Sequence, residues 1–383
     1  MGIYSHVPIV KWGVYAFLIA IHIPILQGEE QTQCPSLSDN PICPCYNFKE
    51  GLFLECPSAT PGVVKNVLSK IRGTIQSLSI YDLESTTTEL KADLFPSQTK
   101  IINLQISQSS IHKISTDAFA SICESLESLS IVSSKLNRIP TESFTDLKKL
   151  EALDFQLNEI QDIQANTFNS LKLKKLNLKG NKIVNISENA LRNLEESMIE
   201  LDITENFLNV FPLKTLEKLK KLSNLRLAWN KINTMPENVN ATIQSLINLD
   251  LSSNLFIKIE RNWLKSIPKI KTLTFFSNRI REIDEEAFYS LQDLETLDLS
   301  RNKIVNLAKN TFQKNRNIRT IDLSHNHLHH IKGVFSDLQH LSEIFLSENN
   351  ILEITNGEFK NSNRVTVLNI EHNAIQRIEE DCF

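Results

Sequence analysis

The sequence predicts an α/β fold of the solenoid type, a curved β–α superhelix of about 13 repeats with a parallel sheet along its concave side. Three observations predict it. An eleven-residue frame with apolar residues at positions 1, 4, 6 and 11 and asparagine at position 9 recurs along most of the chain. The asparagines follow one another at steps of 23 to 25 residues. The remainder of each repeat usually carries an aliphatic residue at position 14 and a phenylalanine at position 19.

The first clear copy of the frame is LEALDFQLNEI, which begins at Leu150. Three degenerate copies precede it and begin at Ile75, Ile101 and Leu126. They carry other residues in the asparagine slot, namely Leu83, Ser109 and Ser134. The asparagines themselves are Asn158, Asn181, Asn206, Asn230, Asn254, Asn278, Asn302, Asn326, Asn349 and Asn373.

The alternation at positions 4 and 6 is that of a strand buried on one face, so positions 2, 3, 5, 7 and 8 are expected to point outward. The asparagine follows the strand where the chain turns, and its amide can bond the backbone groups that the turn leaves unpaired. The second half of each repeat is expected to form short helical or 3₁₀ turns on the convex side. One repeat cannot bury its apolar face alone, so neighbouring repeats must stack.

The first 28 residues indicate a secretory signal peptide, with Lys11 before an apolar run from Trp12 to Leu26 and Gly28 before two glutamates. That run is about 15 residues long, shorter than the roughly 20 that a spanning helix needs; an uncleaved anchor is the alternative. We expect a mature chain that is secreted, extracellular and not inserted in a membrane. We expect three parts: a signal peptide at residues 1–28, a cysteine-rich cap and entry segment at 29–74, and the leucine-rich solenoid of repeats at 75–383.

Composition argues against several classes of function. Lysine and arginine number 41 against 45 acidic residues, so no basic field draws nucleic acid. The nine glycines are scattered, which excludes a phosphate-cradling loop, and we expect no cofactor. Neither G-x-S-x-G nor H-E-x-x-H occurs, and the column Asp250, Asp298, Asp322 fits solvated strand positions, so we expect no enzyme.

A metal site is also not expected. His325 and His372 share position 8 of repeats two apart, with Glu348 between them. At about 4.8 Å per strand the two histidines are roughly 10 Å apart, too far for one zinc ion unless Glu348 bridges a pair of ions.

Four cysteines cluster as C-x8-C-x-C-x10-C, at Cys34, Cys43, Cys45 and Cys56. This spacing favours disulfides in an oxidising compartment over zinc, which prefers C-x2-C pairs. Cys123 and Cys382 lie ten repeats apart and cannot bond each other.

Candidate binding residues occupy outward positions that are usually polar. Trp229 with Arg226 is the strongest pair, and Phe276 and Phe345 follow, because exposed aromatics and arginine dominate interface hot spots. The alternative is that each packs singly against its neighbours. Two glycosylation sequons, at Asn185 and Asn240, fall after the strand and away from the concave face.

With these motifs the chain resembles the extracellular leucine-rich-repeat family, of the typical 24-residue type, from Cys34 to Phe383. The resemblance implies a leucine-rich-repeat solenoid with an N-terminal cap paired Cys34–Cys45 and Cys43–Cys56. Within the family it is similar to secreted arthropod proteins such as the non-catalytic subunit of a shrimp luciferase. Toll ectodomains, small matrix proteoglycan cores and axon-guidance ligands are further members, all with binding roles. The family's cysteine-bearing C-terminal cap does not appear, which indicates either a truncated chain or a capping partner, such as a second copy.

The functional hypothesis is a secreted protein that recognises a protein partner through its concave face, in adhesion, matrix or immune recognition. The alternative is a non-catalytic accessory subunit that stabilises a secreted enzyme.

Overall fold

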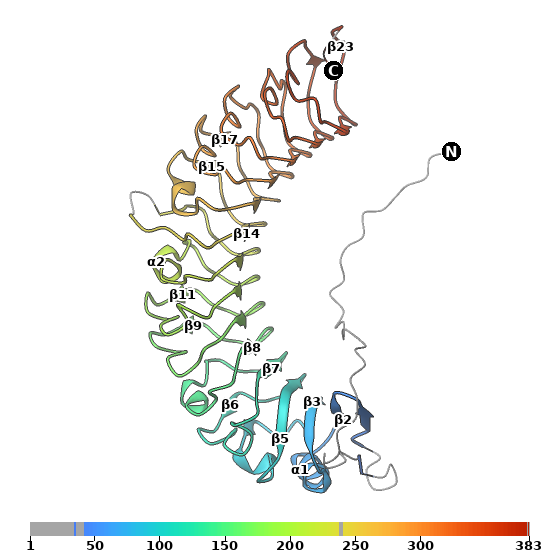
Figure 1. Ribbon diagram of the computed structural model, residues 1–383, viewed down its shortest axis with the longest axis vertical. Coiled ribbons are helices and arrows are strands. Elements are labelled where there is room, and N and C mark those ends of the chain that lie inside the picture. The colour runs from blue at the N-terminus through green and yellow to red at the C-terminus, as the bar shows by residue number, and fades with distance from the viewer. Residues whose placement is uncertain (1–33, 36–41, 237–239, 381, 383) are drawn as a thin grey trace, which may run out of the picture. The chain divides into compact units, whose positions relative to one another are not determined.

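The computed structural model describes residues 34–35, 42–236, 240–380 and 382, which all belong to one compact unit, Thr32–Phe383. The expected signal peptide, 1–28, lies outside the described residues. The unit is a curved stack of repeats with a long sheet along its inner side and α2, β15 and β17 on its outer side (Figure 1). The predicted parallel-strand solenoid is confirmed.

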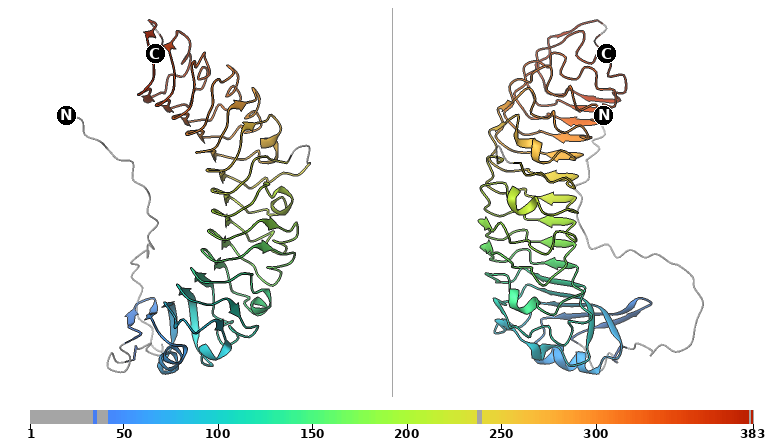
Figure 2. Two further views of the ribbon diagram at one scale, coloured as in Figure 1. Left: turned by 180° about the vertical axis from the view of Figure 1, so that it is seen from behind. Right: turned by 60° about the vertical axis from the view of Figure 1, so that its left-hand side comes forward.

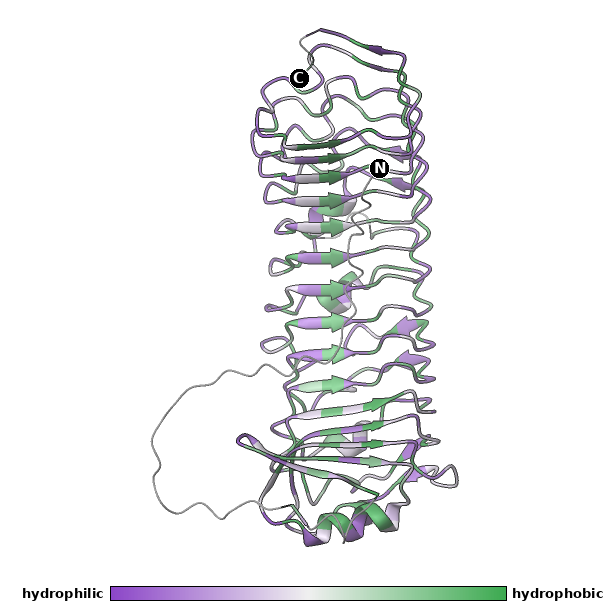
Figure 3. Ribbon diagram, turned by 90° about the vertical axis from the view of Figure 1, so that its right-hand side faces the viewer, coloured by the Kyte–Doolittle hydropathy of each residue, from purple (hydrophilic) through white to green (hydrophobic). Residues whose placement is uncertain are grey.

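Among the described residues, fifteen strands form this sheet, and all are parallel except the first pair. Viewed from the concave side, they make a ladder of short rungs (Figure 3). In spatial order they are β1 (Cys45–Phe48), β2 (Gly51–Pro57), β3 (Thr74–Tyr81), β5 (Lys100–Ser107), β7 (Ser128–Val132), β8 (Ala152–Asp154), β10 (Lys175–Asn177), β12 (Glu200–Asp202), β13 (Asn224–Arg226), β14 (Asn248–Asp250), β16 (Thr272–Thr274), β18 (Thr296–Asp298), β19 (Thr320–Asp322), β20 (Glu343–Phe345) and β22 (Val367–Asn369). The thirteen repeats each supply one strand, and the cysteine-rich segment adds β1 and β2.

The opposite side of the stack differs in part from the expectation of helical turns. It has short helices, namely α2 (Leu213–Leu216) and the 3₁₀ turns η2 (Ala92–Leu94), η3 (Thr141–Phe144) and η4 (Trp263–Ser266). It also has two-residue strand pairs, which the sequence analysis did not anticipate. They are β4 (Glu89–Leu90) with β6 (Lys113–Ile114), β9 (Asp162–Ile163) with β11 (Asn185–Ile186), β15 (Lys258–Ile259) with β17 (Glu282–Ile283), and β21 (Glu353–Ile354) with β23 (Arg377–Ile378).

The leucine positions and the phenylalanine spine form one continuous core. Leu225, Leu227 and their counterparts in other repeats are buried, and so is the spine from Phe119 to Phe312. Successive spine rings are in contact, as between Phe288 and Phe312 at 5.7 Å between centroids. Each repeat therefore completes the core of its neighbour.

The ten asparagines form the expected ladder. In the eighth repeat, Asn254 accepts a hydrogen bond from the Ile232 amide at 3.0 Å and donates to the Leu227 carbonyl at 2.9 Å, both in the preceding repeat. The other nine asparagines repeat this pattern. Each ties the turn of its own repeat to the repeat before it.

The residue at position 8, directly before the asparagine slot, corrects one expectation. It was placed among the outward strand positions, but in all thirteen repeats it lies in the left-handed region, with φ from +50° to +67°. Only one of the thirteen is glycine, Gly180. A left-handed residue ends a strand because it reverses the chain direction locally. Trp229, His325 and His372 therefore lie in turns at the edge of the sheet.

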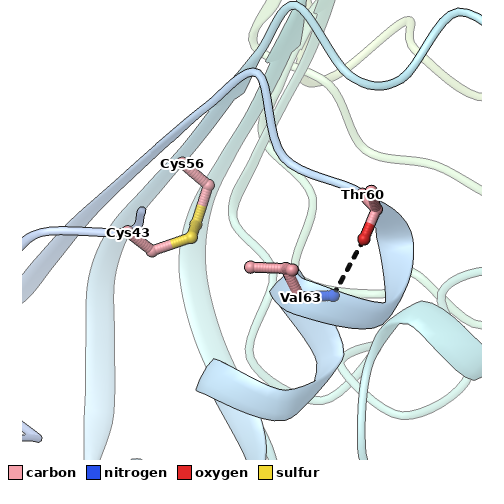
Figure 4. The surroundings of a disulfide bond; sticks show 4 residues. All are labelled: Cys43, Cys56, Thr60 and Val63. Atoms are coloured by element: carbon pink, nitrogen blue, oxygen red, sulfur yellow. Dashed lines mark hydrogen bonds between the residues drawn. A yellow bond between two sulfur atoms is a disulfide. The ribbon is translucent and has the colours of Figure 1, made fainter. Parts of the chain in front are cut away.

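The cysteine-rich segment lies at the N-terminal end of the repeats, where its strand β2 pairs with β3. Its disulfides join Cys34 to Cys45 and Cys43 to Cys56, which confirms the expected pairing. The helix that follows, α1 (Pro61–Lys70), is capped by Thr60, whose hydroxyl accepts the Val63 amide at 3.3 Å (Figure 4). Cys43, Cys56, Val64 and Leu68 are buried together with the first leucines. Cys123 and Cys382 are not in disulfides, and Cys382 is buried.

Candidate protein-binding face

The outward side chains of the sheet come from positions 3 and 5 of each repeat, because positions 4 and 6 face the core. Parallel pairing without register shift from β7 to β22 places the residues of each position in straight columns. Arg226 lies in the position-5 column on β13, between Asp202 and Asp250 on the adjacent strands. Its guanidinium is 3.8 Å from the Asp202 carboxylate, an exposed ion pair that leaves it available to a partner.

The aspartates of this column have a structural role. Asp250, Asp298 and Asp322 each accept the backbone amide two residues later, at 2.9 Å in every case. The bond closes the turn that leads to the left-handed residue. Burial raises the pKa of Asp298, and the charge of Asp322 on the next strand raises it further.

Two position-5 residues from β8 onward carry no side-chain acceptor, Arg226 and Phe345. Neither can cap the amide two residues on, a bond that Asp154, Asn177 and Asn369 make in their repeats. These two repeats lack one turn-closing hydrogen bond, worth about 1 kcal/mol.

Trp229 has the largest exposed fraction, 62%, among the large hydrophobic side chains of the described residues. It follows Arg226 by three residues, in the left-handed turn of the seventh repeat. Its carbonyl accepts the Asn206 amide at 3.2 Å, which places the exposed Phe207 beside the same turn. The Lys231 ammonium lies 4.6 Å from the Phe207 ring centroid. The central edge site is defined here as Arg226, Trp229, Phe207 and Lys231.

The other two candidates lie apart from this site and are half-buried. Phe276 follows β16 at position 7, with the Arg301 guanidinium 6.0 Å from its ring centroid. Phe345 lies on β20, five strands along the sheet from Arg226 and so about 24 Å away at 4.8 Å per strand. Of the four candidates, Arg226 and Trp229 are in the same repeat, Phe276 is two repeats further on and Phe345 is five.

Sequence reasoning missed an aromatic cluster on the β1–β2 hairpin. Tyr46 pairs with Phe53 across the hairpin, and Phe53 pairs with the outward Ser77 on β3, so both rings face the concave side. Phe48, 55% exposed, lies 5.2 Å from the Phe53 centroid and 6.5 Å from the Tyr46 centroid. The hairpin, blue in Figure 2, extends past the edge of the other strands. The signal in the sequence was the alternation of aromatic and polar residues at Tyr46, Asn47 and Phe48, which is typical of a strand with its aromatic side chains on one face.

The charge of the concave columns bears on the class of partner. From β8 to β20, the outward positions 3 and 5 carry only two bases, and both are ion-paired: Lys175 with Glu200 at 3.5 Å, and Arg226 with Asp202. The acids at these positions are Asp154, Glu200, Asp202, Asp250, Asp298, Asp322 and Glu343. This face repels a polyanion and suits a neutral or basic protein surface.

Both sequons lie away from these columns. Asn185 is exposed on β11, and Asn240 is exposed in the seventh repeat, at the position where most repeats carry the spine phenylalanine. Within the part of the chain that the structure describes, no three His, Cys, Asp or Glu side chains are placed to hold a metal ion. No helix in those residues is long and apolar enough to cross a membrane.

Comparison with protein families identifies the class. The model of the leucine rich repeat matches residues 124–183, 172–232, 244–304, 269–328, 292–351 and 339–383. The chain therefore belongs to the leucine-rich-repeat family. No curated protein sequence matches it.

Among solved structures, the chain is similar to one from the Toll–Spatzle complex of Drosophila, with a TM-score of 0.72 and 16% identity. That match covers 89% of this chain but only 53% of the other. A leucine-rich-repeat protein of Leptospira interrogans gives 0.63 and 22% identity, covering 86% of this chain and 85% of that one. The complex of TLR13 with ssRNA13 gives 0.59 and 20%, covering 80% and 55%. At these identities the likeness concerns the fold.

Proposed function

We propose that this chain is a secreted, non-enzymatic binding protein that recognises a protein partner through the concave face, with the central edge site as its main anchor. The observation that carries the proposal is Trp229, a large apolar side chain left mostly in water beside an arginine. Water-exposed tryptophan is unfavourable, and tryptophan and arginine are the residues most enriched in interface hot spots.

Secretion is supported by the apolar N-terminal segment expected to be a signal peptide and by the two disulfides of the cap, which persist in oxidising compartments. The Toll–Spatzle complex supports a protein as the partner. Although the TLR13 complex contains RNA, the acidic concave columns of this chain favour a protein over a nucleic acid.

The size of the face also supports a protein partner. Fifteen strands at about 4.8 Å make a sheet roughly 65 Å long, which exceeds the needs of a metabolite and matches a folded protein. Along this sheet Phe53, on β2, lies seven strand spacings from Arg226, and Tyr46 and Phe48, on β1, lie eight. We include them as a second anchor of the same face.

The test compares partner capture by the secreted wild-type chain and Trp229→Ala, using extracellular fluid of the source and quantitative mass spectrometry. The variant is expected to lose about 2 kcal/mol of binding free energy, or about 30-fold in affinity for the captured partner. The matched control is Ser253→Ala, the same left-handed turn position one repeat on, which is expected to change affinity less than twofold. Leu227→Ala changes a buried core residue two positions before Trp229, and it is expected to lower the stability of the fold instead.

Unchanged affinity per folded Trp229→Ala molecule contradicts the central edge site. Capture of a secreted enzyme, co-eluting with the chain in size exclusion, supports the accessory-subunit role over free-standing recognition.

A further inference from the structure

An apolar groove lies on the flank of the stack between the fifth and sixth repeats, away from the concave columns. Its volume is about 450 Å³, and its lining includes Val184, Ile186, Val210, Pro212 and Pro236. Val184 and Val210 are 45% and 49% exposed, although they are aliphatic. The volume falls in the range of small-ligand sites, whose linings are mainly apolar.

The strand pairing of this flank stops at the groove, where position 15 of the sixth repeat carries no N–H. Where two-residue strands pair, the amide at position 15 donates to the position-14 carbonyl of the preceding repeat, as from Ser187 to Ile163 at 2.9 Å and from Asp284 to Ile259 at 3.0 Å. In the sixth repeat position 15 is Pro212, which has no N–H and so cannot bond the Ile186 carbonyl. The described pairing of β11 is with β9 alone. The side of β11 that faces the sixth repeat is left open as the groove.

Asn185 lies on β11, is exposed, and is itself part of the groove lining. It begins the sequon Asn185-Ile186-Ser187. We propose that the N-linked glycan on Asn185 lies in this groove, where its first N-acetylglucosamine residues cover Val184 and Val210. The proposal rests on the secretion part of the proposed function.

The attachment chemistry is a transfer from a lipid-diphosphate-linked oligosaccharide. The Asn185 Nδ2 forms a bond to C1 of the first sugar, the C1–O bond breaks and its electron pair leaves with the lipid diphosphate, and the proton lost from Nδ2 passes to a base of the transferring enzyme. The C–H faces and acetamido methyl groups of the first sugars then contact the apolar lining. Their hydroxyls meet polar side chains that also line the groove, Glu188, Asn209 and Lys214. An exposed apolar patch on a secreted protein otherwise invites association, so covering it favours a soluble chain.

The test uses the full chain secreted from a eukaryotic host, with site occupancy mapped by mass spectrometry. Asn185→Gln is compared with Asn240→Gln, a matched control because Asn240 is exposed, begins the second sequon and is absent from the groove lining. Asn185→Gln is expected to raise the fluorescence of a bound hydrophobic dye roughly threefold, while Asn240→Gln leaves it unchanged. Enzymatic removal of glycans from the folded wild type is expected to give the same rise, which separates the effect from misfolding during synthesis. Adding Val184→Ser and Val210→Ser to Asn185→Gln is expected to return the signal to the wild-type level.

Two outcomes overturn the inference and leave secretion intact: secreted protein with Asn185 unmodified, and equal dye binding by the two glutamine variants. Dimerisation of the glycosylated wild type that Val184→Ser and Val210→Ser abolish also overturns it, because a second copy would then occupy the groove. A chain that is retained in the cell contradicts both the inference and the proposed function.

Discussion

The asparagine ladder makes a sharp prediction at Asn254, which is almost fully buried. Replacement by alanine removes four hydrogen bonds, but the four backbone groups do not lose equally, because some of them keep another partner. The carbonyls of Leu227, Leu251 and Ser252 each keep another donor, from Asn230, Asn278 and Trp229 respectively. The Ile232 amide loses the Asn254 oxygen, the acceptor to which it is bonded.

The expected loss of stability follows from this difference between the amide and the three carbonyls. A buried amide left without an acceptor costs about 1–3 kcal/mol, and the three carbonyls, which stay bonded, add about 0.5 kcal/mol each. We therefore expect Asn254→Ala to lower the free energy of unfolding by about 3–4 kcal/mol. The matched control is Asn248→Ala in the same repeat. Its half-buried amide donates to Asn224 on the concave face at 2.6 Å, and its loss is expected to cost less than about 1 kcal/mol.

Urea denaturation followed by circular dichroism measures the two free energies, and native-state hydrogen exchange locates the effect. Because repeats contact only their neighbours, faster exchange is expected in the seventh and eighth repeats, above all at the Ile232 amide. Equal costs for Asn254→Ala and Asn248→Ala, or an Ile232 amide that keeps its protection, would refute the reasoning.

Three further predictions address the cap, the concave column and the turns. Replacing Cys43 and Cys56 by alanine should lower the stability of the N-terminal repeats by about 3 kcal/mol, measured by denaturation against Cys123→Ala, which breaks no disulfide and should change stability by less than about 0.5 kcal/mol. Burial raises the pKa of Asp298, so the folded chain holds the proton of this carboxyl group more tightly than the unfolded chain does. The contribution of Asp298 to stability is therefore present below its unfolded pKa of about 3.9 and is lost as pH rises through the folded pKa. Asp298→Asn, which keeps an oxygen for the Ser300 amide, should therefore raise the Tm at pH 7 and lose this advantage at pH 3; the same gain at both pH values would contradict the burial argument. Gly180→Ala places a Cβ 2.6 Å from the Leu157 side chain and should cost about 1 kcal/mol, a penalty that shrinks in a Leu157→Ala background if the contact causes it, as a double-mutant cycle would show.

The repeat frame, the core and the asparagine ladder were predictable because each depends on contacts at fixed sequence intervals. Leu225 is buried by the same positions of its neighbouring repeats as every other position-4 leucine, and Asn254 bonds groups 22 and 27 residues earlier as its counterparts do. Arg226 and Trp229 could be singled out for the same reason, since a repeating frame reveals the positions that depart from it.

Several features escaped the sequence because they depend on backbone geometry that residue type does not specify. The left-handed residue at position 8 is almost never glycine, so Trp229 was assigned to the strand instead of the turn that exposes it. The aromatic hairpin at Tyr46 and Phe48 follows from antiparallel register in the cap, where no repeat exists to reveal a departure.

By itself, the sequence determined the solenoid, its core and which repeat carries unusual side chains, since in a one-dimensional stack a residue's neighbours are fixed by its position in the period. Only the tertiary structure decided which of those side chains reach water together. It placed Trp229 in an exposed turn instead of on the strand, and it showed a groove beside Asn185, where the described pairing of β11 is with β9 alone. Exposure and grooves depend on how the turns of adjacent repeats pack against each other. That packing depends on hydrogen bonds between repeats, which cannot be read from the sequence of one repeat.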